Sequence, residues 1–221
     1  MRLMKQYWTW ENNPGNQQSL KRIERAARTC YKSENKIADG SAEKMVRFLV
    51  QNGHHSVLEH VSASVRFITS RSVTHELVRH RIAAYSQESQ RYVKYGDNMQ
   101  FIRPVWSDLK CRYYDCIEWP EAELESGLKP ELSDYLFLKA CLQAQDNYNA
   151  LINAGWRSEQ AREVLPNAIK TEIVVTYNLR EWRHVFCIRT SVKAHPQMRK
   201  LMKECLNGFK KELPIFFEDI A

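Results

Sequence analysis

Apolar side chains recur at helical spacing in several segments of the chain. In residues 18–31, Leu20, Ile23 and Ala27 lie three or four positions apart, so they fall on one face of an amphipathic helix. Spacing, capping residues and helix breakers together predict further helices. These are a helix from Ser41, its cap, to a stop at Gly53; one from near Ser72 into the segment 79–92; one over 132–154, ended by Gly155; a short one capped by Ser158; and one after Pro196.

Alternation of apolar and polar residues marks a strand in the first half of the chain. In VSASVRF, residues 61–67, every second side chain is apolar, which is the period of a half-buried strand. RLMKQYW, residues 2–8, is predicted as another strand, followed by a loop at 12–16. TEIVVTY, residues 171–177, is predicted as a buried strand.

Residues 97–130 show no long apolar period. Pro104, Pro120 and Pro130 interrupt this stretch, so we expect loops with short elements there. We find no internal repeat, low-complexity segment or linker. The whole pattern predicts an α+β fold, with helices packed around a small, mostly antiparallel sheet, in a single domain over residues 1–221.

The chain carries an excess of positive charge. Lys and Arg number 33 against 26 Asp and Glu, which gives a net charge of +7 and favours an anionic partner. The excess alone does not distinguish nucleic acid from phosphorylated small molecules.

Nothing in the sequence indicates secretion, a membrane span or a metal site. The N-terminus has no uninterrupted apolar segment and is unlike a signal peptide, and no segment approaches the ~20 apolar residues of a membrane helix. The six cysteines include no C-x-x-C pair, and Cys111 and Cys116 have no matching second pair. We therefore expect a cytoplasmic protein with free thiols and no bound metal.

The segment RHRIAAYSQESQRY, residues 79–92, is dense in cationic and polar side chains. Arg79 and Arg81 are two positions apart, so on a regular helix they would point roughly 200° from each other. Either the backbone turns there or the two arginines face different ligands. Ser89 and Arg91 have the same spacing, which on an extended segment puts a hydroxyl and a guanidinium on one side, as suits a phosphate. A solvated basic face is the alternative, and as a nucleophile Ser89 lacks the G-x-S-x-G turn.

The same segment resembles the signature of the flavin-dependent thymidylate synthases. The resemblance covers most of residues 20–200, because three further blocks, one before the segment and two after it, stand in the family's order. The signature R-H-R, seven residues, S stands here as Arg79-His80-Arg81, residues 82–88 and Ser89, followed by Gln90-Arg91-Tyr92; the further blocks are HHSVLEH at 54–60, AREVLP at 161–166 and NLREWRHVFCIR at 178–189.

The resemblance implies an enzyme that converts dUMP to dTMP. It implies 5,10-methylenetetrahydrofolate as the carbon donor and FAD, reduced by NADPH, as the source of electrons. No enzyme nucleophile on uracil is then required, because hydride transfer from the flavin takes over the reduction. The resemblance also implies a homotetramer with sites shared between subunits, and it gives no role to nucleic acid or a membrane.

The resemblance also assigns roles residue by residue. Arg189 matches the catalytic arginine that favours an ionised uracil, since a guanidinium keeps its charge at any working pH. The matching FAD contacts are Ser56, Arg79, His80, Arg81, Gln87, Asn178, Arg180 and His184. The matching dUMP contacts are Glu76, Arg79, Gln87, Ser89, Arg91, Arg162 and Arg189, with the phosphate expected near Ser89, Arg91 and Arg162.

Two positions depart from the family's pattern. Glu88 stands where an apolar residue is usual, and Lys193 where a histidine is frequent, so the local loop geometry and the flavin environment do not transfer directly. No family role is transferred to residues 97–140. Two rival interpretations stay open: a basic helical module that binds nucleic acid through arginines and stacked aromatic side chains, and a flavoenzyme that acts on another uridine substrate.

Overall fold

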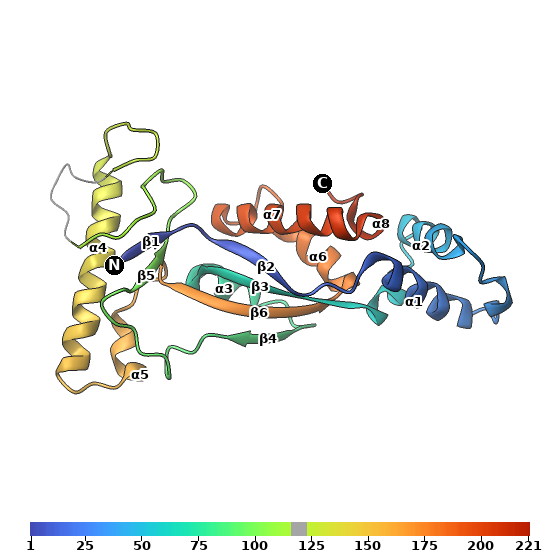
Figure 1. The fold of residues 1–221 in the computed structure, drawn as a ribbon, viewed down its shortest axis with the longest axis horizontal. Coiled ribbons are helices and arrows are strands. Elements are labelled where there is room, and N and C mark those ends of the chain that lie inside the picture. The colour runs from blue at the N-terminus through green and yellow to red at the C-terminus, as the bar shows by residue number, and fades with distance from the viewer. Residues whose placement is uncertain (116–122) are drawn as a thin grey trace. The chain divides into compact units, whose positions relative to one another are not determined.

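A computed structural model describes residues 1–115 and 123–221 (Figure 1). The described chain forms two compact units. The expectation of one domain over residues 1–221 stays a prediction, and so do the expectations for Cys116 and Pro120, which lie outside the described residues. The first unit comprises Met1–Tyr7, Phe67–Arg79 and Ser86–Ile173, and the second comprises Trp8–Arg66, His80–Tyr85 and Val174–Ala221.

The strands form two small sheets. In the first unit, β1 (Arg2–Met4) pairs in parallel with β5 (Gln100–Ile102). The larger sheet has the order β2-β3-β6-β4. Its strands are β2 (Tyr7–Asn12), β3 (Ser62–Ser70), β6 (Lys170–Asn178) and β4 (Ala84–Gln87).

Strands β3 and β6 run antiparallel. Within the second unit the Leu179 N–H donates to the carbonyl of Val61, and within the first unit the Arg71 N–H donates to the carbonyl of Ile169. One residue number rises along this pairing as the other falls, which is the mark of an antiparallel ladder. The predicted α+β class with small, mostly antiparallel sheets is confirmed.

The first unit has its own apolar core. The long helix α4 (Leu132–Asn153) contributes Leu138 and Tyr148, which are fully buried beside Phe101 of β5. Burial of such side chains is the main stabilising term in a unit of this size. The shorter helical elements of this unit are α3 (Arg71–Leu77), α5 (Ser158–Ala161) and the 3-10 turn η3 (Arg162–Val164).

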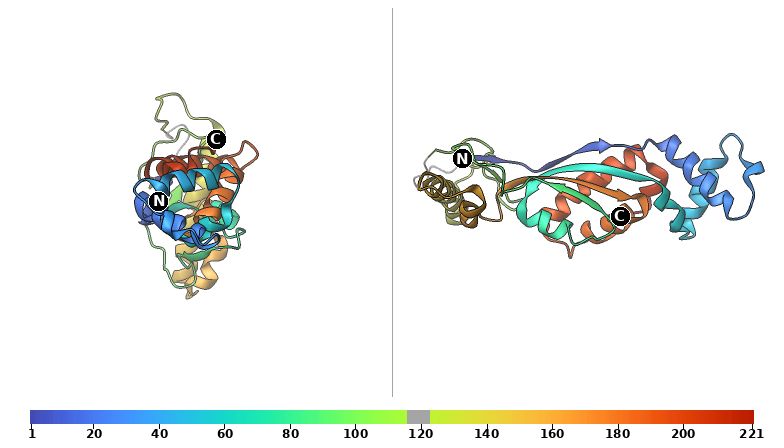
Figure 2. Two further views of the ribbon diagram at one scale, coloured as in Figure 1. Left: turned by 90° about the vertical axis from the view of Figure 1, so that its right-hand side faces the viewer. Right: turned by 90° about the horizontal axis from the view of Figure 1, so that it is seen from below.

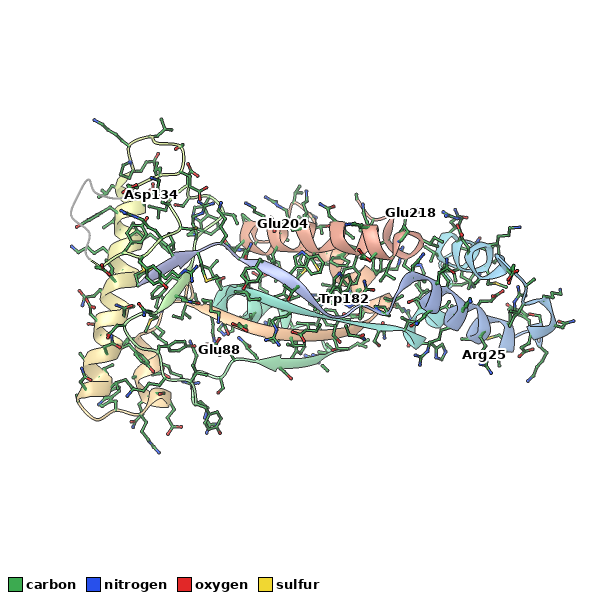
Figure 3. The ribbon with its side chains drawn as sticks, in the orientation of Figure 1. Arg25, Glu88, Asp134, Trp182, Glu204 and Glu218 are labelled. Atoms are coloured by element: carbon green, nitrogen blue, oxygen red, sulfur yellow. The ribbon has the colours of Figure 1, made fainter. Side chains whose placement is uncertain are left out.

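The core of the second unit is aromatic. Trp182 of α6 (Leu179–Arg189) lies 4.8 Å, centroid to centroid, from Phe209 of α7 (Pro196–Glu212). Phe209 is also 5.0 Å from Phe217 of α8 (Pro214–Phe217), and such edge and tilted ring pairs add to the burial energy. Figure 3 labels Trp182. Its Nε1–H donates to the carbonyl of Ala63 in β3 at 3.0 Å, which fixes α6 on the sheet.

The remaining helices of the second unit precede β3. Helices α1 and α2 lie side by side (Figure 2). Among the described residues, no helix combines the length and the apolar character that crossing a membrane requires. The elements are α1 (Asn16–Thr29), η1 (Glu34–Lys36), α2 (Ser41–Gln51) and η2 (His55–His60).

Several predicted boundaries are wrong by one or two residues. Ser41 is the first residue of α2 and not its cap: Gly40, with a φ of +73°, holds the cap position. The Ser41 hydroxyl instead donates to the carbonyl of Ala38 at 2.7 Å. Ser158 likewise begins α5, and Arg157 is its cap. A serine serves both positions well, so sequence alone does not separate them.

Three elements differ from the prediction in kind. The strand predicted at 2–8 divides into β1 and β2, and β2 runs on to Asn12, where the loop was expected. The helix predicted near Ser72 ends at Leu77 and does not enter the segment 79–92. Helix α6 was not predicted at all, because charged residues interrupt its apolar spacing.

Strand β2 and helix α7 meet closely at one glycine. The ring of Trp10 lies 4.5 Å from that of Phe209, and β2 and α7 run near each other in Figure 1. One residue away, a Cβ on Gly208 would overlap the Cζ2 and Cη2 atoms of Trp8. A glycine at position 208 lowers the helix propensity of α7, but it leaves room for the Trp8 indole to pack against the helix backbone.

We expect Gly208→Ala to lower the free energy of unfolding by about 1–3 kcal/mol, because overpacking against Trp8 outweighs the better helix propensity of alanine. In a Trp8→Ala background the same substitution should stabilise the protein. Chemical denaturation of the four variants of this cycle measures both effects. Equal destabilisation by Gly208→Ala in the two backgrounds would contradict the packing explanation.

Candidate functional site

The segment 79–92 is a turn, a short strand and a second turn. Helix α3 ends at Leu77, and Arg79 follows in a hydrogen-bonded turn. The backbone therefore turns at the two arginines, which was one of the two predicted possibilities. The segment belongs to both units, since Arg79 is in the first, His80–Tyr85 in the second, and Ser86 onward in the first again.

In the second unit, His80 lies at the centre of a polar cluster with three residues of α6: Glu181, His184 and Arg189. The Arg189 Nε–H donates to His80 Nε2 at 3.0 Å. His80 Nδ1 is 3.6 Å from a carboxylate oxygen of Glu181, and the two imidazole rings are 6.1 Å apart. We call these four residues the His80 cluster.

His80 is held in its neutral form. Burial, the Arg189 guanidinium and His184 together lower the pKa of His80 from 6.5 to about 4. Because Arg189 donates to Nε2, that nitrogen keeps its lone pair and the ring proton lies on Nδ1, which faces Glu181. The contact with Glu181 is therefore not an ion pair at neutral pH, and burial in turn raises the pKa of Glu181.

Two tyrosines hold the backbone at His80. The Tyr85 hydroxyl donates to the carbonyl of His80 at 2.7 Å. It also lies 2.8 Å from the hydroxyl of Tyr177 in β6, which must then be the donor of that bond. Burial raises the pKa of both phenols, so they stay protonated and keep these hydrogen bonds at any working pH.

The His80 cluster contains donor atoms that could suit a metal ion. One atom each from His80, Glu181 and His184 lies within 4.8 Å of the others. The imidazole of His80 has no spare lone pair, however, because Nε2 accepts from Arg189 and Nδ1 carries the proton. The guanidinium would also repel a cation, so the geometry fits an anionic ligand better than a metal.

The first unit contains a pocket of about 280 Å³ with a cationic lining. Arg162, predicted as a phosphate contact, lies in it together with Arg71, His75 and Gln90. The Arg71 and Ser72 N–H groups donate to the carbonyls of Ile169 and Asn167, which fixes the start of α3 at the rim. The remaining lining residues are Glu163, Leu165, Pro166, Asn167 and Ile169.

Sequence reasoning missed Arg71 and His75. The available signal was their position, since Arg71 is the first residue of a helix that follows a strand directly and His75 lies one turn later. Neither residue belongs to a recognisable motif, and only the pairing of β3 with β6 brings them to Arg162.

The predicted nucleotide contacts 87–91 lie in the first unit. The Gln87 amide donates to the hydroxyls of Thr74 at 2.9 Å and Thr171 at 3.3 Å. Ser89 and Arg91 lie in a turn and not on the extended segment that their spacing would suit: the Arg91 N–H donates to the Ser89 hydroxyl at 3.3 Å. Polar side chains that bond the backbone two residues on favour such turns over strands.

Two of the predicted nucleotide contacts have acidic neighbours. Arg91 Nε is 3.7 Å from a carboxylate oxygen of Glu159, and Arg162 Nε is 3.6 Å from one of Glu163. In each pair one side chain is exposed and the other partly exposed, so each pair contributes little stability and leaves the arginine available to a stronger anion. Glu76, also predicted here, is half-buried on α3.

Some of the predicted flavin contacts already bond other residues of the protein, and others are exposed to solvent. Asn178 caps α6 by accepting the Glu181 N–H at 2.8 Å, and Arg180 pairs with Glu59 at 2.6 Å. Ser56 is exposed in η2. Arg79 and Arg81 are also exposed, and within 1–115 and 123–221 neither guanidinium has a carboxylate partner. The capping role of Asn178 had a signal in the sequence, an Asn followed three residues later by Glu.

Comparisons with known proteins agree on one family. A family model described as "Thymidylate synthase complementing protein" matches residues 14–215. Proteins named "Flavin-dependent thymidylate synthase" are 39% identical in Mycobacterium tuberculosis (strain ATCC 25618 / H37Rv), over 89% of this chain and 78% of the relative, and 38% identical in Mycobacterium avium (strain 104), over the same shares.

A solved structure has the same fold. The UMP/dUMP methylase PolB from Streptomyces cacaoi, bound with 5-Br dUMP, superposes with a TM-score of 0.76 over 99% of this chain and 96% of that chain. The two sequences are 22% identical, so this likeness concerns the fold alone.

In a titration followed by NMR, we expect His80 to protonate near pH 4, whereas an unperturbed histidine does so near 6.5. Arg189→Met should raise the pKa of His80, though not to 6.5, because burial is the largest cause of the shift. His184→Gln should raise it less, and His80→Gln identifies the signal. An ordinary pKa for His80 in the unsubstituted protein would contradict the assigned tautomer.

The same shift has a consequence for stability. Between pH 6.5 and about 4 the unfolded chain binds a proton at His80 that the folded chain does not, so this residue makes the folded state lose stability as the pH falls through that window. Arg189→Met should reduce the loss.

Proposed function

Because the chain belongs to the family of flavin-dependent thymidylate synthases, which are methyltransferases, we propose that it converts dUMP to dTMP. The proposed carbon donor is 5,10-methylenetetrahydrofolate, and the proposed redox cofactor is FAD, reduced by NADPH. The observation that carries the proposal is the family match over residues 14–215, which includes the R-H-R-x7-S motif. Family membership favours this enzyme over a nucleic-acid-binding module.

The arginine-lined pocket of the first unit is the proposed site of the nucleotide phosphate. Arg71 and Arg162 supply two guanidinium groups and Gln90 an amide, and a phosphate dianion is the ligand that such forks bind best. Ser89 and Arg91 flank Gln90 in the chain. Ser89 is proposed as a binding residue and not a nucleophile, since the sequence around it lacks the G-x-S-x-G turn of a nucleophilic serine.

The residues assigned to FAD fit an anionic dinucleotide. Arg79 and Arg81 are exposed and have no carboxylate partner in the part of the chain that the structure describes, so both are available to a pyrophosphate. Bound FAD would supply the hydride for the reduction. The further proposed contacts are Ser56, His80, Gln87, Asn178, Arg180 and His184.

Arg189 is the proposed catalytic residue. Its Nε is committed to His80 Nε2, which fixes the plane of the guanidinium. A fixed positive charge next to uracil would stabilise negative charge that develops on the ring, and it would need no reorganisation during the reaction. His80 serves this role only while neutral, because a protonated imidazole could not accept the bond.

The assembly and location remain proposals. A homotetramer would let each site draw on more than one chain, as the resemblance implies. The five described cysteines, at positions 30, 111, 141, 187 and 205, are free thiols, as expected in the reducing cytoplasm.

An anaerobic assay tests the function. The purified protein should be yellow or become so with FAD, and dUMP should perturb its absorbance. Reduced protein, dUMP and methylenetetrahydrofolate should yield dTMP, with enzyme lacking either substrate as the control. Absence of dTMP under these conditions would overturn the proposal, and methylation of UMP in place of dUMP would favour a flavoenzyme on another uridine substrate.

Ser89→Ala should weaken dUMP binding while turnover remains measurable. Loss of one hydrogen bond to a charged phosphate corresponds to roughly a tenfold rise in KM, and kcat at saturating dUMP should change much less. Steady-state kinetics separate the two parameters. A nucleophilic serine predicts the opposite result, complete loss of turnover at saturating dUMP.

A further inference from the structure

A nearly buried ion pair lies directly beside the proposed nucleotide contacts. Glu88 and Lys170 are 3.0 Å apart, and each side chain is only 15% exposed. The Tyr95 hydroxyl donates to the other carboxylate oxygen of Glu88 at 2.8 Å. Lys170 also pairs with Glu172 at 2.5 Å. Figure 3 labels Glu88, and all of these residues belong to the first unit.

The cluster ties the segment 87–89 to the start of β6 at three points. The Glu88 N–H donates to the carbonyl of Glu172 at 2.9 Å. On one side of Glu88, the Gln87 amide donates to the hydroxyl of Thr171. The third point is the Glu88 carboxylate on Lys170. We call these three contacts, together with the hydrogen bond from Tyr95 to Glu88, the clamp around Glu88.

The charges and hydrogen bonds of these side chains favour the forms that keep the contacts. Burial lowers the pKa of Lys170, but its hydrogen bonds and charge interactions with Glu172 and Glu88 more than offset this and raise it overall. Burial and the neighbouring Glu88 charge raise the pKa of Tyr95, so it remains a donor. A partly desolvated carboxylate that loses such partners is strongly destabilised, so the arrangement has one preferred geometry.

We propose that Glu88 is a positioning residue: its ion pair with Lys170 and its hydrogen bond from Tyr95 hold the segment 87–89 in the geometry that binds the nucleotide. The inference rests on the proposed role of this segment in dUMP binding. Glu88 itself is not proposed to contact the nucleotide. It acts through its two neighbours in the chain, Gln87 and Ser89.

Three substitutions test whether Glu88 acts by positioning the segment 87–89 or only through its negative charge. Glu88→Gln removes the charge that Lys170 and Tyr95 bind, Tyr95→Phe removes only the hydroxyl, and Glu172→Gln removes the second carboxylate that binds the same lysine. We expect the Kd of the FAD-loaded protein for dUMP to rise on the order of tenfold in Glu88→Gln and about threefold in Tyr95→Phe. The Glu172→Gln variant should stay near the unsubstituted value.

Absorbance titration of the bound flavin with dUMP gives each Kd, and kcat at saturating dUMP should stay within about threefold of the unsubstituted enzyme, since positioning affects binding and not the reacting atoms. An unchanged Kd in Glu88→Gln, or an equal rise in Glu172→Gln, would overturn the inference. Should Glu88→Gln prove unfolded by thermal denaturation, Tyr95→Phe decides, because it keeps both charges paired; an unchanged Kd there would overturn the inference as well.

The titration also distinguishes this inference from the proposed function. If the unsubstituted protein binds dUMP but forms no dTMP, the proposed reaction fails while the Kd series still tests Glu88. If the unsubstituted protein forms dTMP and the Kd for dUMP is the same in all variants, only the proposed role of Glu88 is overturned.

Discussion

The antiparallel pairing of β3 with β6 is the constraint on which both polar sites depend. Each strand is followed without a loop by a helix that carries site residues, α3 after Ser70 and α6 after Asn178. The backbone bonds from Leu179 to Val61 and from Arg71 to Ile169 fix the register at the two ends of the pairing. A slip of one residue would turn the alternating side chains of both strands to the opposite face and displace Arg71 from Arg162.

The cationic residues of the two units differ in how they are used. Arg183, buried in α6, donates to both carboxylate oxygens of Asp219 and serves the fold of the second unit. Arg189 instead donates its Nε–H to His80, a neutral histidine. Arg79 and Arg81 have no carboxylate partner among the described residues. The excess positive charge is therefore divided between arginines that stabilise the fold and arginines that are available to anions.

Sequence patterns predicted the fold class and most elements, because long periodic segments such as 132–154 are strongly determined by burial. They missed α6, whose apolar spacing is interrupted by residues that belong to the site, Glu181 and His184. They also did not reveal the turn at Ser89 and Arg91, because residue spacing does not show that a serine hydroxyl will bond the backbone two residues on.

The candidate site was predictable only where a motif carried it. The R-H-R-x7-S pattern led to His80 and Gln87, and the block at 178–189 led to Arg189. Arg71 and the contacts of Glu88 with Lys170 depend on residues about eighty to a hundred positions apart in the chain. Those contacts arise from strand register, which a single sequence does not specify.

Because residue 178 caps α6, only some amino acids suit this position. Asn178 commits its Oδ1 to the backbone N–H of Glu181, so the flavin contact proposed for it falls to the Nδ2 amide, a pure donor. Aspartate would cap the helix equally well but has no N–H to offer, and it would set a negative charge against an anionic cofactor. Serine and threonine have a single hydroxyl on a shorter side chain. Asparagine divides the two demands between two atoms, because its oxygen caps the helix and its nitrogen is left to donate to the proposed cofactor.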